Sequence, residues 1–284
     1  MNQIKIALLK AFTDDKCQGN PAGVILNADA LSDEEMTYVA KEVGFSESVF
    51  VQKSNLADFK LRFFSSLGEV NLCGHATLSA THYIKEKGLS VTSFLTFETN
   101  TGIIQVNCSN KLMSMRMPLP TYITHEVEKA EVAKLFNLNQ SELLNLPIEI
   151  ISTGTPKLLV GIASLESLFS IRPDFEAIKE FSLRSGSRGI YAFTPQTMQA
   201  SSDFHARQFN PIAGINEDPV TGVAAAALGA YVKKHGLLNK KQFIVEQGHV
   251  LNKFGKIFVN LEDGIEIGGF AVTYGEVFCN LDHI

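Results

Sequence analysis

Cysteine and positive charge are both scarce in this sequence of 284 residues. The four cysteines are scattered and show no C-x-x-C spacing, so we expect reduced thiols in a cytoplasmic protein rather than a disulfide framework. The formal net charge is −5, and no run of lysine or arginine stands out. Nucleic acids and anionic membrane surfaces are therefore not expected partners.

Long apolar runs and nucleotide-binding motifs are missing as well. The longest apolar run, 223–232, is far shorter than a membrane span needs. The apolar segment after Met1 is short and is followed by no small-residue cleavage site, so we expect no signal peptide. A Walker loop and a G-x-G-x-x-G motif are both absent, which leaves nucleotide binding unsupported.

The remaining composition is that of a soluble globular protein, with 45% hydrophobic and 19% charged residues. The most informative stretch runs from Arg207 to Gly236 and reads as a strand, a loop and a helix. Every residue in 223–232 is apolar or glycine, so the helix should be buried on all sides. We expect Asp218 to be its N-cap, which places the polar loop 217–222 at the electropositive end of the helix. Such a loop is suited to hold an anion.

The same pattern occurs earlier in the chain. The residues around the two helices match at a spacing of 148 positions: Cys73 with Thr221, Gly74 with Gly222, Ala76 with Ala224, Tyr83 with Tyr231 and Gly88 with Gly236. The preceding strands match at a spacing of 145, and 46–50 matches 187–191 more weakly at 141. Matches in one order with slowly growing spacing indicate a duplicated half.

The rest of the chain predicts a mixed α/β (α+β) fold. Ser32 and Glu35 form a capping-box pattern that opens a helix ending near Val43. Alternating apolar residues predict several strands, with a hairpin at 100–102, and Pro118 with Pro120 marks a linker. We therefore expect two pseudo-symmetric halves, each a sheet curled around its central helix, with the two helix N-termini lining one cleft.

Three titratable side chains are expected to meet in that cleft: Glu47, His75 and Asp218. Proton transfer at carbon needs a base sheltered from water and donors that stabilise the developing negative charge. The first backbone N–H groups of each helix, at 74–77 and 222–225, could supply these donors. The arrangement would bind the carboxylate of a small acid without a metal.

Each residue also has a structural interpretation. Glu47 could be a solvated carboxylate at a strand end, Asp218 only a helix cap, His75 a surface residue, and Cys73 a small buried hydrophobe. Residues 44–48 resemble the nucleophile-elbow motif G-x-S-x-G but lack its last glycine, which argues against a serine hydrolase. A zinc site from Cys73, His75 and His82 is disfavoured because His82 lies two helical turns beyond His75.

Four segments together resemble the PhzF (phenazine biosynthesis) isomerase-like family, within the diaminopimelate epimerase-like fold superfamily: GNPAGVIL, GFSESVFV, LCGHATLSATHYI and EDPVTGVAAAALGAY. The resemblance implies two halves, each a β-barrel-like sheet wrapped around a central buried helix, with the active site in the cleft between them. The halves would be residues 1–118, completed by strand 271–284, and 119–270. It also implies a homodimer without cofactor or metal.

The resemblance further implies that Glu47 is the general acid/base, with His75 and Asp218 as its polar partners. The substrate-binding residues would be Cys73, Gly74, Ala76, Thr221, Gly222 and Val223. The implied activity is a cofactor-independent isomerase or epimerase in a biosynthetic process, which moves a proton between carbons of a small carboxylic acid.

Two departures leave alternatives open. Amino-acid racemases of the superfamily carry a cysteine at each helix N-terminus, whereas here Cys73 matches Thr221, so a two-thiol racemase lacks half of its machinery. The family commonly has serine where this chain has Val223, which favours a different or smaller acid than the phenazine-pathway substrate. A non-catalytic protein that binds small anions on the same scaffold is the other alternative.

Overall fold

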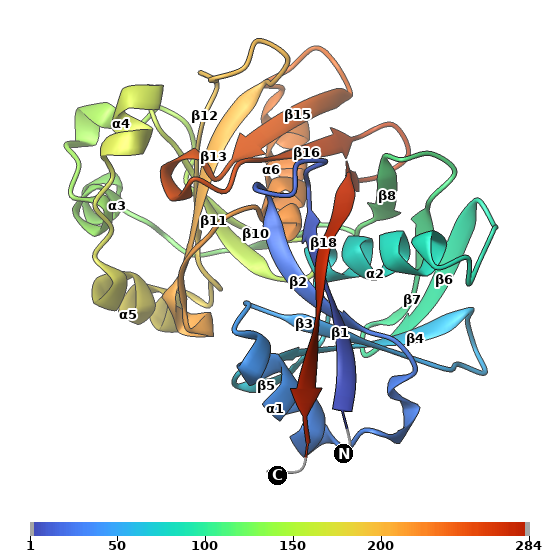
Figure 1. Ribbon diagram of the computed structural model, residues 1–284. Coiled ribbons are helices and arrows are strands. Elements are labelled where there is room, and N and C mark those ends of the chain that lie inside the picture. The colour runs from blue at the N-terminus through green and yellow to red at the C-terminus, as the bar shows by residue number, and fades with distance from the viewer. Residues whose placement is uncertain (1–2, 282–284) are drawn as a thin grey trace. The chain divides into compact units, whose positions relative to one another are not determined.

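The computed structural model describes residues 3–281, which form a sheet-rich α/β fold (Figure 1). The chain divides into two compact units. Unit 1 contains the residues up to Arg116 and those from Gly268 onward, and unit 2 is Met117–Ile267. Strand β17 (Glu266–Gly269) crosses this boundary along the chain. Within the described residues, none of the helices combines the length and hydrophobicity that spanning a bilayer requires.

Unit 1 is built from nine further strands and two α-helices. Its strands are β1 (Gln3–Ala11), β2 (Asn20–Ile25), β3 (Ser48–Gln52), β4 (Phe59–Ser65), β5 (Gly68–Val70), β6 (Phe94–Thr99), β7 (Gly102–Asn107), β8 (Met113–Arg116) and β18 (Ala271–Asn280). Its helices are α1 (Asp33–Val43) and α2 (Gly74–Glu86), with a short 3-10 turn, η1 (Ala28–Ala30). The last strand returns to the start of the chain, because β18 pairs antiparallel with β1 over its whole length. Residues 282–284 of the strand expected at 271–284 lie outside the described residues.

Unit 2 is built from strands β9 to β16 and helices α3 to α6. The strands are β9 (Thr121–Ile123), β10 (Glu149–Ser152), β11 (Pro156–Gly161), β12 (Ile190–Thr194), β13 (Phe204–Asn210), β14 (Ile215–Asp218), β15 (Gln242–Gln247) and β16 (Gly255–Asn260). The α-helices are α3 (Lys129–Phe136), α4 (Leu165–Ser170), α5 (Phe175–Ser185) and α6 (Gly222–His235). Three 3-10 turns complete it: η2 (Gln140–Glu142), η3 (Pro211–Ala213) and η4 (His249–Leu251).

Strand pairing shows that the two units repeat one plan. In unit 1 the pairs β1–β2, β2–β3, β3–β4, β4–β6 and β6–β7 are antiparallel, parallel, antiparallel, parallel and antiparallel. In unit 2 the pairs β10–β11, β11–β12, β12–β13, β13–β15 and β15–β16 follow the same sequence of directions. A short strand, β5 or β14, adds antiparallel to the fourth strand of each set. The duplication expected from the sequence is therefore confirmed by the topology.

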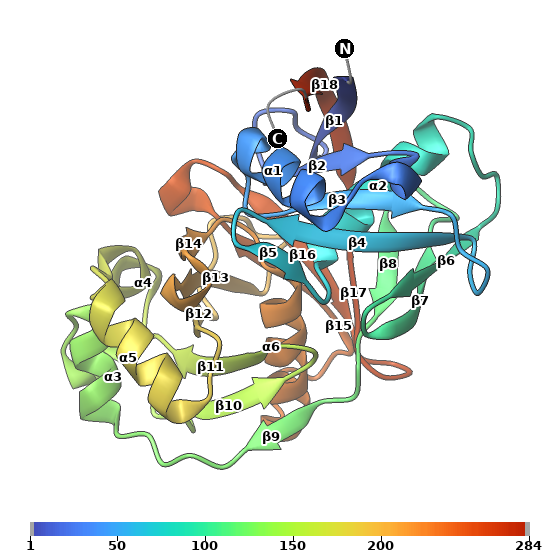
Figure 2. The ribbon, with the colours of Figure 1, turned by 90° about the horizontal axis from the view of Figure 1, so that it is seen from below.

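A buried helix lies at the centre of each repeat. In α2 all residues of 74–81 are buried, and in α6 all residues of 224–232 are buried. Helix α2 packs against β1, β2, β3 and β18, and α6 packs against β10, β11 and β16. Outer helices cover the opposite face of each sheet: α1 in unit 1, and α3, α4 and α5 in unit 2 (Figure 2). Because these stretches are buried on all sides, each central helix can be stable only with the sheet wrapped around it.

A duplicated ion pair marks the repeat at the level of side chains. Arg62 donates from Nε and Nη2 to the two carboxylate oxygens of Glu69, each at 2.8 Å, and Arg207 does the same with Glu217 at the same distances. Each guanidinium also lies over a phenylalanine ring two residues along its strand. Such two-point pairs hold β5 against β4 and β14 against β13 with defined geometry.

Three details of the sequence interpretation were wrong. Ser48 pairs with Phe64 and Ile190 pairs with Phe209, so these segments match at 142 rather than 141 positions. Asp218 is not a helix cap: it ends β14, and Thr221 is the N-cap residue of α6. The apolar residues of 126–138 recur with the 3.6-residue period of a helix, which predicts a helix over this whole range, but the observed helix is shorter, Lys129–Phe136. The capping box of Ser32 with Glu35 and the hairpin at 100–102 are confirmed.

One carboxylate ties the last strand to the first strand and to the central helix of unit 1. Glu276 on β18 lies 2.7 Å from Lys5 Nζ, and Tyr83 on α2 donates to it at 3.0 Å. These contacts, the Lys5 hydrogen bond above all, lower the pKa of Glu276 from 4.5 to about 2.

The stability that Glu276 contributes is present above pH 4.5 and is lost as the pH falls toward 2, because the lowered pKa belongs to the folded state alone. We expect Glu276→Gln to flatten the fall of Tm across this window, measured by circular dichroism. The matched control is Glu180→Gln, an exposed carboxyl on α5. If both variants kept the wild-type dependence of Tm on pH, the contacts of Glu276 would make no measurable contribution to stability.

Candidate functional site

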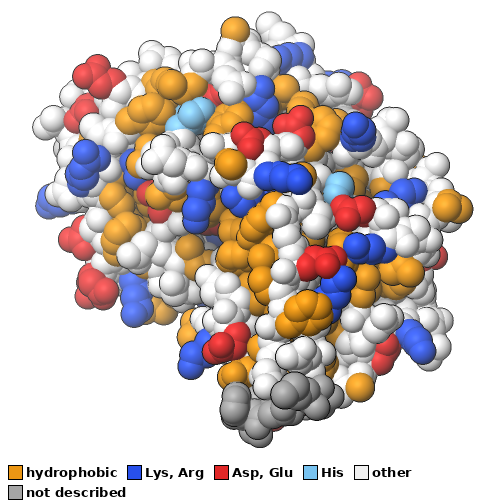
Figure 3. Space-filling view, viewed as in Figure 1, with side chains coloured by type: hydrophobic (Ala, Val, Ile, Leu, Met, Phe, Trp, Pro, Cys, Tyr) orange, Lys and Arg blue, Asp and Glu red, His pale blue; other side chains and the backbone are white. Residues whose placement is uncertain are grey.

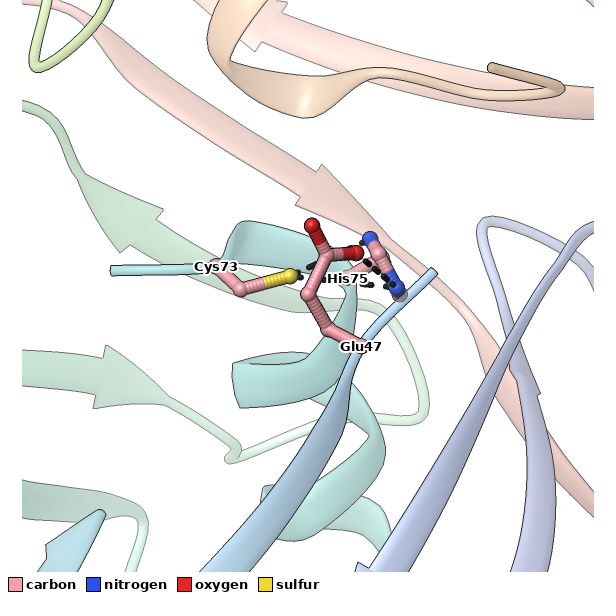
Figure 4. Close-up of side chains that lie close together, drawn as sticks. All are labelled: Glu47, Cys73 and His75. Atoms are coloured by element: carbon pink, nitrogen blue, oxygen red, sulfur yellow. Dashed lines mark hydrogen bonds and ion pairs between the residues drawn. The ribbon is translucent and has the colours of Figure 1, made fainter. Parts of the chain in front are cut away.

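The first cluster lies in unit 1, at the N-terminus of the buried helix α2. Glu47 immediately precedes β3, Cys73 is the N-cap residue of α2, and His75 lies in its first turn. Cys73 and His75 are buried, and the Glu47 side chain is 20% exposed. Figure 4 shows the three side chains pointing toward one another. The helix N-terminus and the strand β3 thus place an acid, a thiol and an imidazole in one partly sheltered position.

The local fold explains how Glu47 reaches this position. Gly44 ends α1 in the left-handed conformation and turns the chain toward β3. Strands β2 and β3 run parallel, with Gly23 beside Ser48, so both strands begin at the same edge of the sheet. A Cβ atom on Gly23 would lie only 2.7 Å from Ser48 Oγ, which explains why glycine stands there in the GNPAGV segment. Close packing of these two strands therefore sets the position of Glu47.

Contacts around His75 define its hydrogen-bonding state. Asn20 Nδ2 and Cys73 Sγ each lie 3.3 Å from His75 Nδ1. Both can donate a hydrogen to this nitrogen, so Nδ1 is assigned as the acceptor and Nε2 carries the hydrogen. His75 Nε2 lies 3.6 Å from Glu47 Oε2, longer than a hydrogen bond but within ion-pair range. The imidazole therefore presents its N–H to the carboxylate, and a protonated imidazole would stabilise the charged form of Glu47.

The same three side chains could also hold a metal. One ligand atom from each of Glu47, Cys73 and His75 lies within 4.8 Å of the others. Oxygen, sulfur and nitrogen ligands in this combination suit a zinc-like ion. His82 does not take part, because its Nε2 lies 3.2 Å from Glu86. The expected absence of a metal remains a prediction.

The second cluster lies in unit 2, at the N-terminus of α6. The Thr221 hydroxyl donates to Asp218 Oδ2 at 2.5 Å, so the threonine that matches Cys73 is held by the carboxylate that the sequence selected. Gly222 is buried at the first position of the helix, and the carbonyl of the half-buried Val223 accepts from Thr153 Oγ1 at 3.1 Å. In the other unit, Gly74 and Ala76 occupy the matching buried first turn.

Gln247 organises this loop and was not singled out from the sequence as a site residue. Its Nε2 donates to the Asp218 carbonyl at 2.8 Å, and its Oε1 accepts from Thr221 N at 3.2 Å and from the Tyr191 hydroxyl at 3.1 Å. Gln247 and Tyr191 are both buried. Burial, and then the charge of Asp218, raises the pKa of Tyr191 well above 10, so its hydroxyl stays a donor. Gln247, at the end of β15, thereby contacts both Asp218 and Thr221.

The sequence pointed to the candidate reactive side chains but not to the residues that hold them in place. Asn20, which contacts His75, lies inside the GNPAGV segment but carries no distinctive spacing of its own. Gln247 lies in the segment 245–247, which matches 97–99 at the same spacing of 148 positions as the two central helices. A polar residue at the end of a buried strand could have drawn attention to it.

Comparisons with known proteins agree with these observations. The family model described as phenazine biosynthesis-like protein matches residues 9–276. The chain belongs to this family. An uncharacterized isomerase from Bacillus subtilis, YfhB, is 33% identical over 270 residues, which cover 93% of this chain and 92% of the relative.

Solved structures of the family and of the wider fold are similar too. A phenazine biosynthesis protein of the PhzF family from Bacillus anthracis is 31% identical, with a TM-score of 0.91, and the match covers 99% of this chain and all of that one. A hydroxyproline epimerase from Agrobacterium vitis shares the fold with a TM-score of 0.65 at 14% identity, covering 99% of this chain and 93% of that one. The phenazine biosynthesis-like family and its epimerase-type fold are thus established for this chain.

Truncating Gln247 tests whether it orders the second cluster. We expect Gln247→Ala to lower the free energy of unfolding by about 1–3 kcal/mol, because buried groups of Thr221 and Tyr191 lose their hydrogen-bond partner. Hydrogen exchange should show faster exchange in peptides that cover 218–222. Gln52→Ala is the control, since that side chain makes a hydrogen bond to Ala28 O in unit 1. Unchanged exchange in 218–222 would contradict the assigned role of Gln247.

Proposed function

We propose that this member of the phenazine biosynthesis-like family is a cofactor-independent isomerase that moves a proton between carbons of a small carboxylic acid. The observation that carries the proposal is the cluster of Glu47, Cys73 and His75 at the N-terminus of a buried helix. The relatives support the reaction class, since YfhB is called an isomerase.

Glu47 would be the general base and then the general acid. Its carboxylate removes a proton from a carbon next to an activating carboxyl or double bond, which leaves an enolate-like anion and a neutral Glu47. The proton on Glu47 exchanges with solvent, and Glu47 then protonates a different carbon, so the carboxylate is regenerated and no redox partner is needed. His75 is a positioning residue in this scheme, because its N–H faces Glu47 rather than the solvent.

The helix N-termini would hold the negative charge. The first N–H groups of an α-helix have no partner within the helix and carry partial positive charge. Residues Cys73, Gly74 and Ala76 in unit 1 and Thr221, Gly222 and Val223 in unit 2 would bind the substrate, with Asp218 as the second polar partner.

Unit 2 carries no second thiol for a racemase of the two-cysteine type. Thr221 stands where the repeat would place the second cysteine, and its hydroxyl is bound to Asp218. A hydroxyl with this partner is a much weaker acid than a thiol. The arrangement therefore favours a single carboxylate that both removes and returns the proton.

Replacing Glu47 tests the proposed base. We expect Glu47→Gln to lower the rate of deuterium incorporation from solvent into a C–H bond by about 10²–10⁴-fold, the usual contribution of a general base. Proton NMR in D₂O with a panel of small unsaturated and cyclic carboxylic acids provides the measurement. Tm should move by no more than about 2–4 °C, the shift produced by ~1 kcal/mol in a domain of this size.

Glu42→Gln provides the matched control, because it removes an exposed carboxyl five residues earlier and should leave the rate unchanged. Full activity in Glu47→Gln would show that another group is the base. Binding of an acid without any incorporation of deuterium by the wild-type protein would indicate a binding protein instead of an enzyme.

Replacing Asp218 tests whether unit 2 contributes. Asp218→Asn keeps an oxygen that can accept from Thr221 but removes the charge, and we expect kcat/KM to fall by at least about tenfold, equivalent to ~1.4 kcal/mol. Asp263→Asn, an exposed change elsewhere in unit 2, should have no effect. An unchanged kcat/KM in Asp218→Asn would confine the active site to unit 1.

A further inference from the structure

A second group of ionisable side chains lies in the interior of unit 2: His205, Glu246 and His249. His205 on β13 and Glu246 on β15 are neighbours in the parallel register of these strands, and both are fully buried. His249 begins the short turn η4 and is half-buried. One ligand atom from each residue lies within 4.8 Å of the others, and the two imidazole ring centres are 4.7 Å apart.

The carboxylate of this group is fully satisfied, whereas the imidazoles are not. Glu246 accepts from His205 Nδ1 at 2.8 Å and from the backbone N–H groups of Met198 and Gln199. The opposite nitrogen of His205, Nε2, is buried and has no hydrogen-bond partner among residues 3–281. The same holds for His249 Nδ1. A buried polar atom without a partner costs about 1–3 kcal/mol, so these two nitrogens call for a ligand.

The repeat shows that the fold does not require histidine here. The matching residues of unit 1 are Lys60 on β4 and Glu98 on β6, which pair in the same strand register and form an ordinary ion pair at 3.3 Å. Lysine would therefore serve to neutralise the carboxylate at this position. In unit 2 an imidazole takes its place, and an imidazole, unlike an ammonium group, offers a second nitrogen that can bind a metal.

Aromatic rings line this group. The ring of Phe169 packs edge-on against His205 at 5.0 Å between centroids, and the ring centroid of Phe254 lies 4.5 Å from that of His249.

We propose that His205, Glu246 and His249 form a site for a divalent transition metal of the zinc class. His205 Nε2 and His249 Nδ1 are the ligand atoms, and Glu246 holds His205 by its other nitrogen, in the carboxylate–histidine–metal arrangement common in proteins. The sequence predicted no metal, and this site is separate from the three residues of unit 1. Because Zn–N bonds are about 2.0–2.1 Å, the half-buried His249 ring must turn slightly toward His205.

The site would have a structural role, because η4 supports the second cluster. Only Gly248 separates the turn from Gln247, and a Cβ on Gly248 would lie 2.8 Å from the Pro219 carbonyl, so this glycine packs against the loop 218–222. A metal bridging His205 and His249 would hold η4 against β13 and thereby hold that loop. Proton transfer by Glu47 does not depend on it.

The experiment uses the full chain, freed of metals with a chelator and then dialysed against Zn²⁺. We expect one zinc ion per chain, a higher Tm with zinc, and faster hydrogen exchange in 247–253 without it. His249→Gln, on a partly exposed turn, should fold and should bind zinc at least about tenfold more weakly. Glu246→Gln should weaken binding by about 10- to 100-fold, as loss of a supporting carboxylate does.

Two control variants each remove a possible zinc ligand elsewhere in the chain. Cys73→Ser removes a ligand of the unit 1 cluster, and His82→Gln removes an imidazole that pairs with Glu86 on α2. Both should keep the zinc affinity and the Tm shift of the wild type. The proposal is overturned if the metal-free protein takes up no zinc, or if uptake is lost in either of these variants and kept in His249→Gln.

Discussion

The structure depends on two helices that are buried on all sides over most of their length. The buried residues of α6 are almost all Leu, Ala, Val and Gly, and in α2 small and hydroxylated residues are buried as well. Water is excluded from such a helix only if a sheet curls around it, and the repeated strand directions in the two units are the solution that the chain adopts twice. Each helix must still begin somewhere, and its N-terminal N–H groups then lie at the edge of a sheet among polar loop residues. The candidate chemistry occurs at these two edges.

The duplicated scaffold carries chemistry that is not duplicated. The repeat places Thr221 where unit 1 has Cys73, and Val223 where it has His75. The corrected register places Gly189 at the position of Glu47, so unit 2 has no equivalent of the proposed base. Unit 2 instead has Asp218, where unit 1 has Val70, and Gln247, where it has Thr99. The same asymmetry applies to the interior, where His205 replaces Lys60. Common backbone geometry with divergent side chains is expected when one half keeps the acid–base group and the other provides contacts.

Figure 3 shows acidic and basic side chains interspersed over one face, without a large area of one sign, as the net charge of −5 suggested.

Long, strongly patterned features were predicted well. The all-apolar run 223–232 and its earlier counterpart identified both central helices, although the N-cap of α6 was placed three residues too early, at Asp218 instead of Thr221. The capping box at Ser32 was read correctly since its hydrogen bonds are local. Short features failed: β14 was missed, and Asp218 was taken for a cap, although Asp-Pro before an apolar run resembles a helix start. The one-residue error in matching 46–50 arose because the spacing of alternating apolar residues tolerates shifts that only strand pairing resolves.

The order of amino acids was enough to predict the duplication, the two buried helices and the family, and to select Glu47, Cys73, His75 and Asp218 as candidate site residues. All of these follow from local pattern or from similarity along the chain. The folded structure alone decided which atoms meet. His75 Nε2 faces Glu47, and Gln247 accepts a hydrogen bond from Thr221 N. The imidazole rings of His205 and His249 lie side by side, and each has one buried nitrogen without a hydrogen-bond partner among the described residues. These contacts join residues that are far apart in the chain. Their distances are set by strand register and close packing, for which a one-dimensional pattern carries no direct signal.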